Sequence, residues 1–228
     1  MRLTILIALI GLLPGIQLAA DENSPAVAGP QATAVTRQLD ARANSLDTLK
    51  EIEKKQMLLK GIFIKMLSRS QSENVLDVEA MKETFTKLQS EYQQGVAVEA
   101  ALSPLIQQAN HQIPQQLRTW ETAILKMNDP LLKRKSEAEL AHARTIWLRL
   151  EESMKKASVT AADTLKRLKK TLDYFESKKN DKFLTVFRKE ILSIHTVVID
   201  LLKTLSHSLE ENQDFQATFS NQPLSSPS

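Results

Sequence analysis

The amino-acid sequence predicts an all-α fold, an elongated antiparallel bundle or coiled coil of three to four helices. Glycine and proline are scarce across residues 32–214, as long helices require. Apolar residues in this stretch recur at steps of three and four, and the alternation typical of strands is nearly absent. A sustained repeat of about 3.5 residues indicates narrow, coiled-coil-like seams. Because the breaks between helices are short, chain neighbours should pack antiparallel.

The first two predicted helices span about residues 32–68 and 77–127. The seam of the first comprises Leu46, Leu49, Ile52, Leu59, Phe63 and Met66. The seam of the second comprises Met81, Phe85, Leu88, Tyr92, Val96, Leu102, Ile106, Ala109, Ile113, Leu117, Trp120, Ile124 and Met127. Gly95, Pro104 and Pro114 interrupt the second helix. We expect a restart at Ser103-Pro104 and a kink at Pro114, because proline removes a backbone donor.

The third and fourth predicted helices span about residues 130–178 and 181–214. Asn128-Asp129-Pro130 predicts a stop and a fresh start, with Asp129 as the helix cap. The third seam comprises Leu140, Ala143, Trp147, Leu150, Met154, Ala157, Ala161, Leu165, Leu168, Leu172 and Phe175. The fourth seam comprises Leu184, Phe187, Ile191, Ile194, Val198, Leu201 and Leu205.

Residues 1–20 have the layout of a secretory signal peptide. Arg2 gives a positive start, residues 3–13 are apolar, Pro14-Gly15 follows, and cleavage is expected after Ala20. The alternative is an uncleaved anchor, although the apolar run is short for a bilayer span. Residues 21–31 and 215–228 are polar and rich in proline or serine, and we expect both to be disordered tails around a helical bundle at 32–214.

The composition excludes several classes of site. The chain has 5 Gly and 0 Cys, which leaves no glycine-rich phosphate loop, disulfide, thiolate nucleophile or cysteine-bound metal. A cysteine-free exported helical chain fits a bacterial periplasm. The histidines are too far apart in sequence to share a helical turn; they are His111, His142, His195 and His207. We therefore expect no enzyme, no catalytic residues, no cofactor and no metal.

Positive charge is concentrated in residues 129–189, which carry a net charge of +7. The candidate surface for an anionic partner comprises Lys166, Arg167, Lys170, Lys178, Lys179 and Lys182. The alternative is a solvated coiled-coil face neutralised by ion pairs four residues apart, or balanced by the acidic second and fourth helices. The acid-first pairs are Glu151–Lys155, Glu152–Lys156 and Asp163–Arg167. Because no aromatic residues interleave with these cations, nucleic acid is not an expected partner.

Three stretches resemble a bacterial cell-envelope family known only as domain of unknown function twenty-nine fifty-nine. They are Trp120-Glu121 with residues 131–137, Ala143-Arg144 through residues 150–157, and the turn at 178–181 with the helix end at 209–215. The resemblance runs from about Leu59 to Phe215. It implies an exported, predicted coiled-coil protein without assigned activity, often anchored by lipid. This chain lacks the cysteine that such an anchor needs.

These observations predict a non-enzymatic periplasmic protein of the cell envelope, acting as a scaffold or interaction protein. Its expected partner is an unknown envelope protein or an anionic envelope surface. It should have no transmembrane helix after signal cleavage, and a dimer is left open. The alternative is a membrane-active or lipid-binding helical protein. The broad apolar band at residues 58–67, with Gly61 as a hinge, motivates it, although burial between two neighbouring helices is the explanation of the band that we favour.

Overall fold

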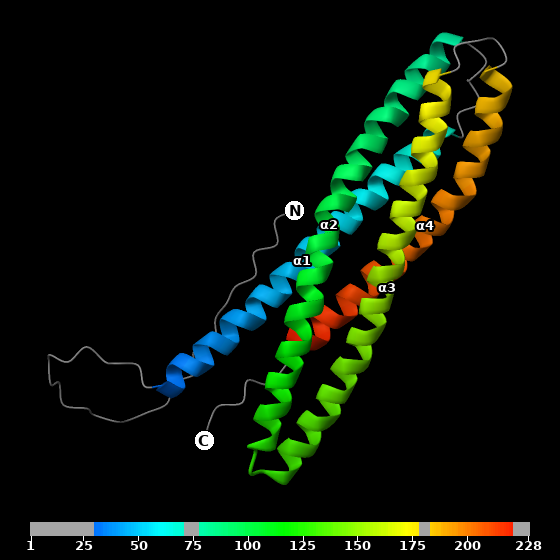
Figure 1. Cartoon of the computed structure of the whole chain (residues 1–228). Helices are drawn as coiled ribbons and strands as arrows, with labels where there is room; N and C mark the ends of the chain where they lie inside the picture. The colour runs from blue at the N-terminus through cyan, green and yellow to red at the C-terminus, as the bar shows by residue number, and fades with distance from the viewer. Residues whose placement is uncertain (1–29, 71–77, 178–182, 221–228) are drawn as a thin grey trace, which may run out of the picture.

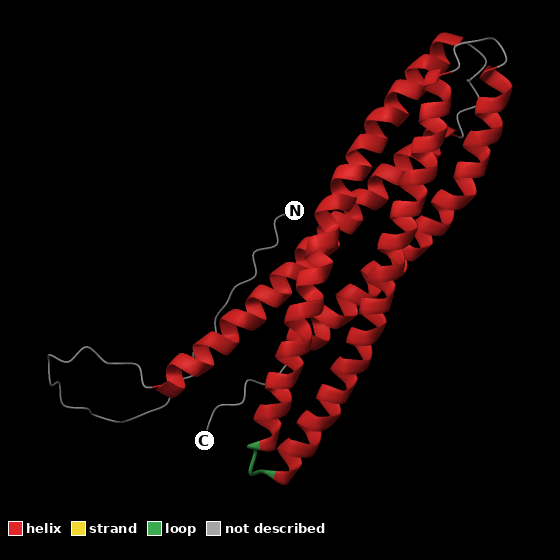
Figure 2. Cartoon of the chain, in the orientation of Figure 1, coloured by secondary structure: helices red, strands yellow, loops and turns green. Residues whose placement is uncertain are grey.

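The computed structural model describes residues 30–70, 78–177 and 183–220. Within them it contains four α-helices and no strand: α1 (Pro30–Ser70), α2 (Val78–Leu125), α3 (Pro130–Ser177) and α4 (Phe183–Ser220). Figures 1 and 2 show these helices as a long, slender bundle. The predicted all-α, elongated antiparallel bundle is thereby confirmed, with four helices. The predicted signal peptide at 1–20 lies outside the described residues.

Each helix packs against two others. The contacts join α1 to α2, α2 to α3, α3 to α4, and α4 back to α1, which closes the ring of an up-and-down bundle. The turn between α2 and α3 forms one end of the molecule, beyond the point where α4 stops (Figure 1). The N-terminal half of α1 diverges from the α2–α3 hairpin at that end. The hairpin therefore projects from the bundle as two helices.

The interior contains two hydrophobic clusters, one toward each end. The cluster near the start of α2 uses short side chains on α3, and we call it the small-residue core; it includes Phe63, Leu88, Ala157, Ala161, Leu165 and Leu201. The cluster toward the α2–α3 turn is the aromatic core; it includes Ile52, Ile113, Trp120, Trp147, Phe215 and Phe219. In the aromatic core, the rings of Trp147 and Phe215 lie 5.4 Å apart.

A polar layer, made of Gln56, Ser208 and Asn212, separates the two cores. All three side chains are fully buried. The Gln56 amide donates to the Ser208 hydroxyl at 2.9 Å, and the Asn212 amide donates to the backbone carbonyl of Leu49 at 3.0 Å. These bonds join α1 to α4 at one register, because a slide of either helix would leave buried polar groups without partners.

Most of the predicted seams are confirmed. Of their described side chains, all are buried or half-buried except that of Val96, which is 38% exposed. The seam of α2 passes instead through Glu91, Gly95 and Val98, and all three are buried. The side chains of Met81, Leu184, Phe187, Ile191 and Ile194 lie outside the described part. Because Glu91 is polar and Gly95 has no side chain, the spacing of apolar residues does not reveal this part of the seam.

One predicted interruption of the second helix is corrected by the structure. Pro104 and Pro114 both lie inside a continuous α2, so the expected restart at Ser103-Pro104 is wrong. The predicted stop after α2 is confirmed: the Asp129 carboxylate accepts from the backbone N–H groups of Leu131 and Leu132, at 2.8 and 3.2 Å. This is the bonding of an N-cap, with Pro130 in the first turn of α3.

The C-terminal end of the bundle also differs from the prediction. We expected the last helix to end at residue 214 and a tail to begin at 215, whereas α4 continues to Ser220. The reason is that Phe215 and Phe219 extend the seam by one more heptad step, and both rings are buried. Ser208 and Asn212 occupy the two preceding seam positions, so the apolar pattern is interrupted there although the helix is not.

The apolar band at residues 58–67 is shared between core and surface. Leu59, Ile62, Phe63 and Met66 are buried, while Leu58 and Ile64 are about half exposed. α1 lies between α2 and α4, as the burial interpretation of this band requires. The band therefore packs inside the bundle on one face and leaves a narrow apolar edge on the other.

Candidate functional site

The predicted basic surface is in part visible on α3. Lys166, Arg167 and Lys170 are all exposed, and we call these three residues the basic face. Their spacing of three and four residues brings them together within about one helical turn. The remaining predicted members, Lys178, Lys179 and Lys182, lie outside the described residues. The structure thus brings half of the predicted set together on one face.

The neutralising ion pairs that the sequence suggests along α3 do not form. Within the described residues, Glu151–Lys155, Glu152–Lys156 and Asp163–Arg167 make no ion pair, whereas Lys169 binds Asp173 at 2.6 Å. The hydrogen bond and charge of Asp173 raise the pKa of Lys169. No described carboxylate lies within ion-pair distance of the basic face. Among the described residues, no carboxylate therefore neutralises its three positive charges.

The arginines nearer the α2–α3 turn behave differently. Arg144 binds Glu121 of α2 at 2.7 Å, and Arg149 approaches Glu211 of α4 at 3.4 Å. The hydrogen bond and charge of Arg144 lower the pKa of Glu121. The acidic neighbours of α3 thus balance its charge along the aromatic core, as one interpretation of the sequence expected, but not at the basic face.

The buried polar groups serve packing between helices. Thr48, buried on α1, accepts from the Gln108 amide at 3.2 Å and donates to the Gln112 carbonyl oxygen at 3.1 Å. Glu53 accepts from Gln213 at 2.8 Å and from Gln216 at 3.0 Å, at the rim of the polar layer. These contacts link α1 to α2 and α4. They position these three helices against one another.

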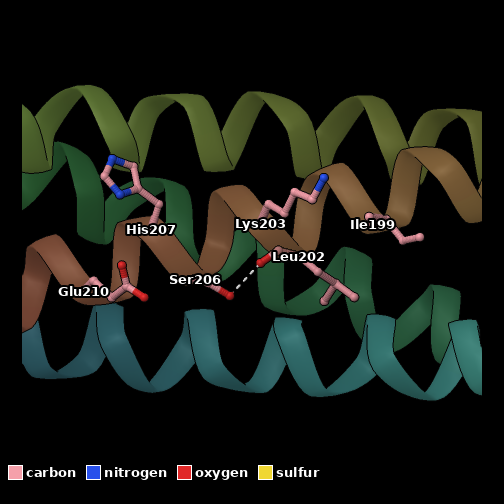
Figure 3. A pocket seen from close by; sticks show the side chains of 6 residues that line it. All are labelled: Ile199, Leu202, Lys203, Ser206, His207 and Glu210. Carbon is pink, nitrogen blue, oxygen red and sulfur yellow. Dashed lines mark hydrogen bonds between the residues drawn. The ribbon is translucent and has the colours of Figure 1, made fainter.

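A shallow hollow lies on the outer face of α4 (Figure 3). It is lined by Ile199, Leu202, Lys203, Ser206, His207 and Glu210, which all belong to one helix. The Ser206 hydroxyl donates to the backbone carbonyl of Leu202 at 2.8 Å, so it is engaged by its own helix. In the described part, no three His, Asp or Glu side chains gather as metal ligands.

The turn between α2 and α3 carries exposed leucines that our sequence analysis missed. Leu125, Leu131 and Leu132 are 69%, 78% and 58% exposed. The sequence contains a signal for them. Counted back from Leu140 in steps of four and three, the seam of α3 passes through Ser136 and Lys133. Leu131 and Leu132 therefore lie outside the seam of α3 and are exposed to solvent.

None of the described helices combines the length and the apolar character that a membrane crossing requires. No curated protein and no solved structure matches the chain. The model of one family, described as a protein of unknown function (DUF2959), matches residues 38–219. That range covers most of the chain and ends within the last turn of α4. The chain belongs to this DUF2959 family, as the resemblance in its helical segments predicted.

Proposed function

We propose that the chain is an exported, non-enzymatic scaffold or interaction protein of the bacterial cell envelope, and that the basic face of α3 binds an acidic partner. The observation that carries this proposal is the cluster of Lys166, Arg167 and Lys170, exposed and without a described carboxylate partner. Like charges spaced three and four residues apart weaken a helix slightly. Such a cluster is more readily explained by binding than by folding.

The rest of the bundle supports a scaffolding role. The two cores and the polar layer hold four long helices in one register, which gives a stiff rod with fixed surface positions. The predicted signal peptide and the absence of cysteine from the sequence favour the periplasm of a Gram-negative bacterium. An acidic envelope protein would meet the basic face there, guided by charge complementarity.

The test is differential capture of partners from a periplasmic extract. The K166E/R167E/K170E variant reverses the basic face, and K50E/K54E/K203E makes the same charge change at exposed lysines of α1 and α4. We expect the wild-type chain and the control to retain the same acidic protein. Raising the salt concentration or reversing the basic face should release it.

Capture that is equal for both variants would contradict the role of the basic face. Retention of no protein by the wild-type chain, over several growth conditions, would contradict the interaction role itself.

A further inference from the structure

The exposed leucines at the α2–α3 turn lie among positive charges. Residues 125–135, which we call the hairpin tip, contain Lys126, Lys133, Arg134 and Lys135 beside the three leucines. Asp129 is the one acidic residue in that range, and its carboxylate is engaged in capping α3. Lys135 approaches Glu139 at 3.9 Å, while the other three cations have no described carboxylate at ion-pair distance.

The hairpin tip stands clear of the rest of the bundle. Trp147 of α3 contacts Phe215 of α4, which places these two residues at one level. From there α3 extends about 25 Å to Pro130, whereas α4 ends about 8 Å beyond Phe215, at 1.5 Å per residue. Figure 1 shows the α2–α3 turn at the extreme end of the molecule. A flat surface can therefore approach the tip without meeting α4.

We propose that the hairpin tip docks on the surface of an anionic lipid bilayer. A narrow end that carries exposed apolar side chains and cations within one short range of residues matches the interface of such a bilayer. The leucines enter the boundary between headgroups and acyl chains, and the lysines and arginine lie at the phosphates. Long basic side chains reach the headgroup level while their stems cover apolar surface.

The fold needs no rearrangement for this contact. The leucines are exposed in the packed bundle, and Asp129 and Pro130 fix the start of α3 that presents two of them. The proposal deepens the proposed function by naming a bilayer as the surface on which the scaffold stands, and it rests on export of the chain. The two contacts are separate, because the basic face lies far along α3 from the tip.

Vesicle binding by the full exported chain tests the proposal. The vesicles consist either of phosphatidylethanolamine with phosphatidylglycerol, or of phosphatidylcholine alone. The wild-type chain should cosediment with the anionic vesicles and at least tenfold less with the neutral ones. The L131Q/L132Q variant should lose at least tenfold in binding, because its apolar contact is gone. The matched control is L148Q, which changes a leucine 63% exposed on the shaft of α3 and should bind as wild type.

A second measurement locates the contact. Because the chain has no cysteine, a single Leu131→Cys or Leu148→Cys substitution accepts one polarity-sensitive dye at a known position. Anionic vesicles should shift the emission of the dye at 131 to the blue and leave the dye at 148 unchanged. Circular dichroism melting of each variant verifies that the bundle is intact.

Three results would overturn the tip proposal. The first is that the wild-type chain binds anionic vesicles no better than neutral ones. The second is that L131Q/L132Q binds anionic vesicles as well as the wild-type chain does. The third is that the dyes at 131 and 148 shift equally. The K166E/R167E/K170E variant separates the two proposals. This variant should lose its acidic partner and keep its binding to vesicles. If vesicle binding depended on the basic face alone, that result would overturn the tip proposal and leave the proposed scaffold role intact.

Discussion

The two cores of the bundle achieve burial by different means. In the small-residue core, Ala157 and Ala161 are fully buried, and Gly95 lies where an added Cβ would be 3.0 Å from a methyl group of Leu165. In the aromatic core, Trp147 packs on Phe215, and Phe215 stacks on Phe219 at 5.2 Å. Small residues let helix backbones approach closely, while large rings fill the space between helices that are farther apart.

This difference predicts opposite sensitivities to mutation. The aromatic core should be damaged by removing atoms, and the small-residue core by adding them. The polar layer between them should contribute more to register than to stability. Both projecting features of the molecule, the hairpin tip and the divergent start of α1, belong to the aromatic end (Figure 1).

The largest effect is expected from Trp147→Ala. The side chain is 3% exposed and contacts Phe215, so its removal leaves a large cavity. The free energy of unfolding should fall by about 3–5 kcal/mol, measured by urea denaturation. Leu148→Ala, at the exposed neighbouring position, should change it by less than about 0.5 kcal/mol. Equal effects of the two substitutions would refute the aromatic core as described.

A smaller effect is expected at the boundary between the cores. Asn212→Ala removes the amide that donates to the Leu49 carbonyl and the oxygen that accepts from Gln216. The free energy of unfolding should fall by about 1–3 kcal/mol, because the buried Leu49 carbonyl loses the hydrogen bond from this amide. Asn110→Ala, at an exposed position of α2, is the control and should be nearly neutral. An unchanged free energy of unfolding in Asn212→Ala would contradict the role given to the polar layer.

The two glycines of the bundle offer a matched pair. Gly61→Ala meets nothing within 4 Å and should raise the free energy of unfolding by about 0.5–1 kcal/mol, through helix propensity alone. Gly95→Ala has the same propensity gain but must displace Leu165, so its stabilisation should be clearly smaller or absent. Chemical denaturation of both variants measures the difference. Equal stabilisation would show that the helices of the small-residue core are not tightly apposed.

The smallest effect concerns the charge balance beside the aromatic core. Arg144 lowers the pKa of Glu121 below its ordinary value of 4.5. A lowered pKa means that the stabilisation from this pair is present above the ordinary pKa and is lost as the pH falls through the lowered one. NMR titration of the Glu121 carboxyl should show a midpoint that rises toward 4.5 in the Arg144→Gln variant. An unchanged midpoint would mean that the ion pair is not formed in solution.

Most of the fold was predictable from the sequence because apolar residues mark most of the seams. The failures occur where a seam position is polar or is glycine. Gly95 and Glu91 concealed the course of α2, and Ser208 and Asn212 concealed the last turns of α4. The spacing of apolar residues predicts which hydrophobic side chains are buried. It cannot predict that an amide is buried because its hydrogen-bond partner lies on another helix. Those partners depend on the tertiary fold.

The candidate surfaces were only partly predictable. The charge pattern of α3 predicts the basic face. It does not predict the lack of ion pairs there, because the spacing of residues in the sequence does not determine the rotamers of exposed side chains. The leucines of the hairpin tip could have been found from the seam of α3, which passes over Leu131 and Leu132 when it is counted back from Leu140. Once Leu125 ends that helix and Asp129 caps the next, Leu131 and Leu132 have no helix to face.

Fractionation of the native protein, with mass analysis of its N-terminus, tests the proposed role most directly. An envelope scaffold should start after Ala20, leave the cell with the periplasmic fraction, and be released from any membrane by salt washes without detergent. A chain that retains Met1 and stays in the cytoplasm would contradict export. A chain that requires detergent for release would contradict surface docking, because residues 1–20 or inserted helices would then hold it in the membrane.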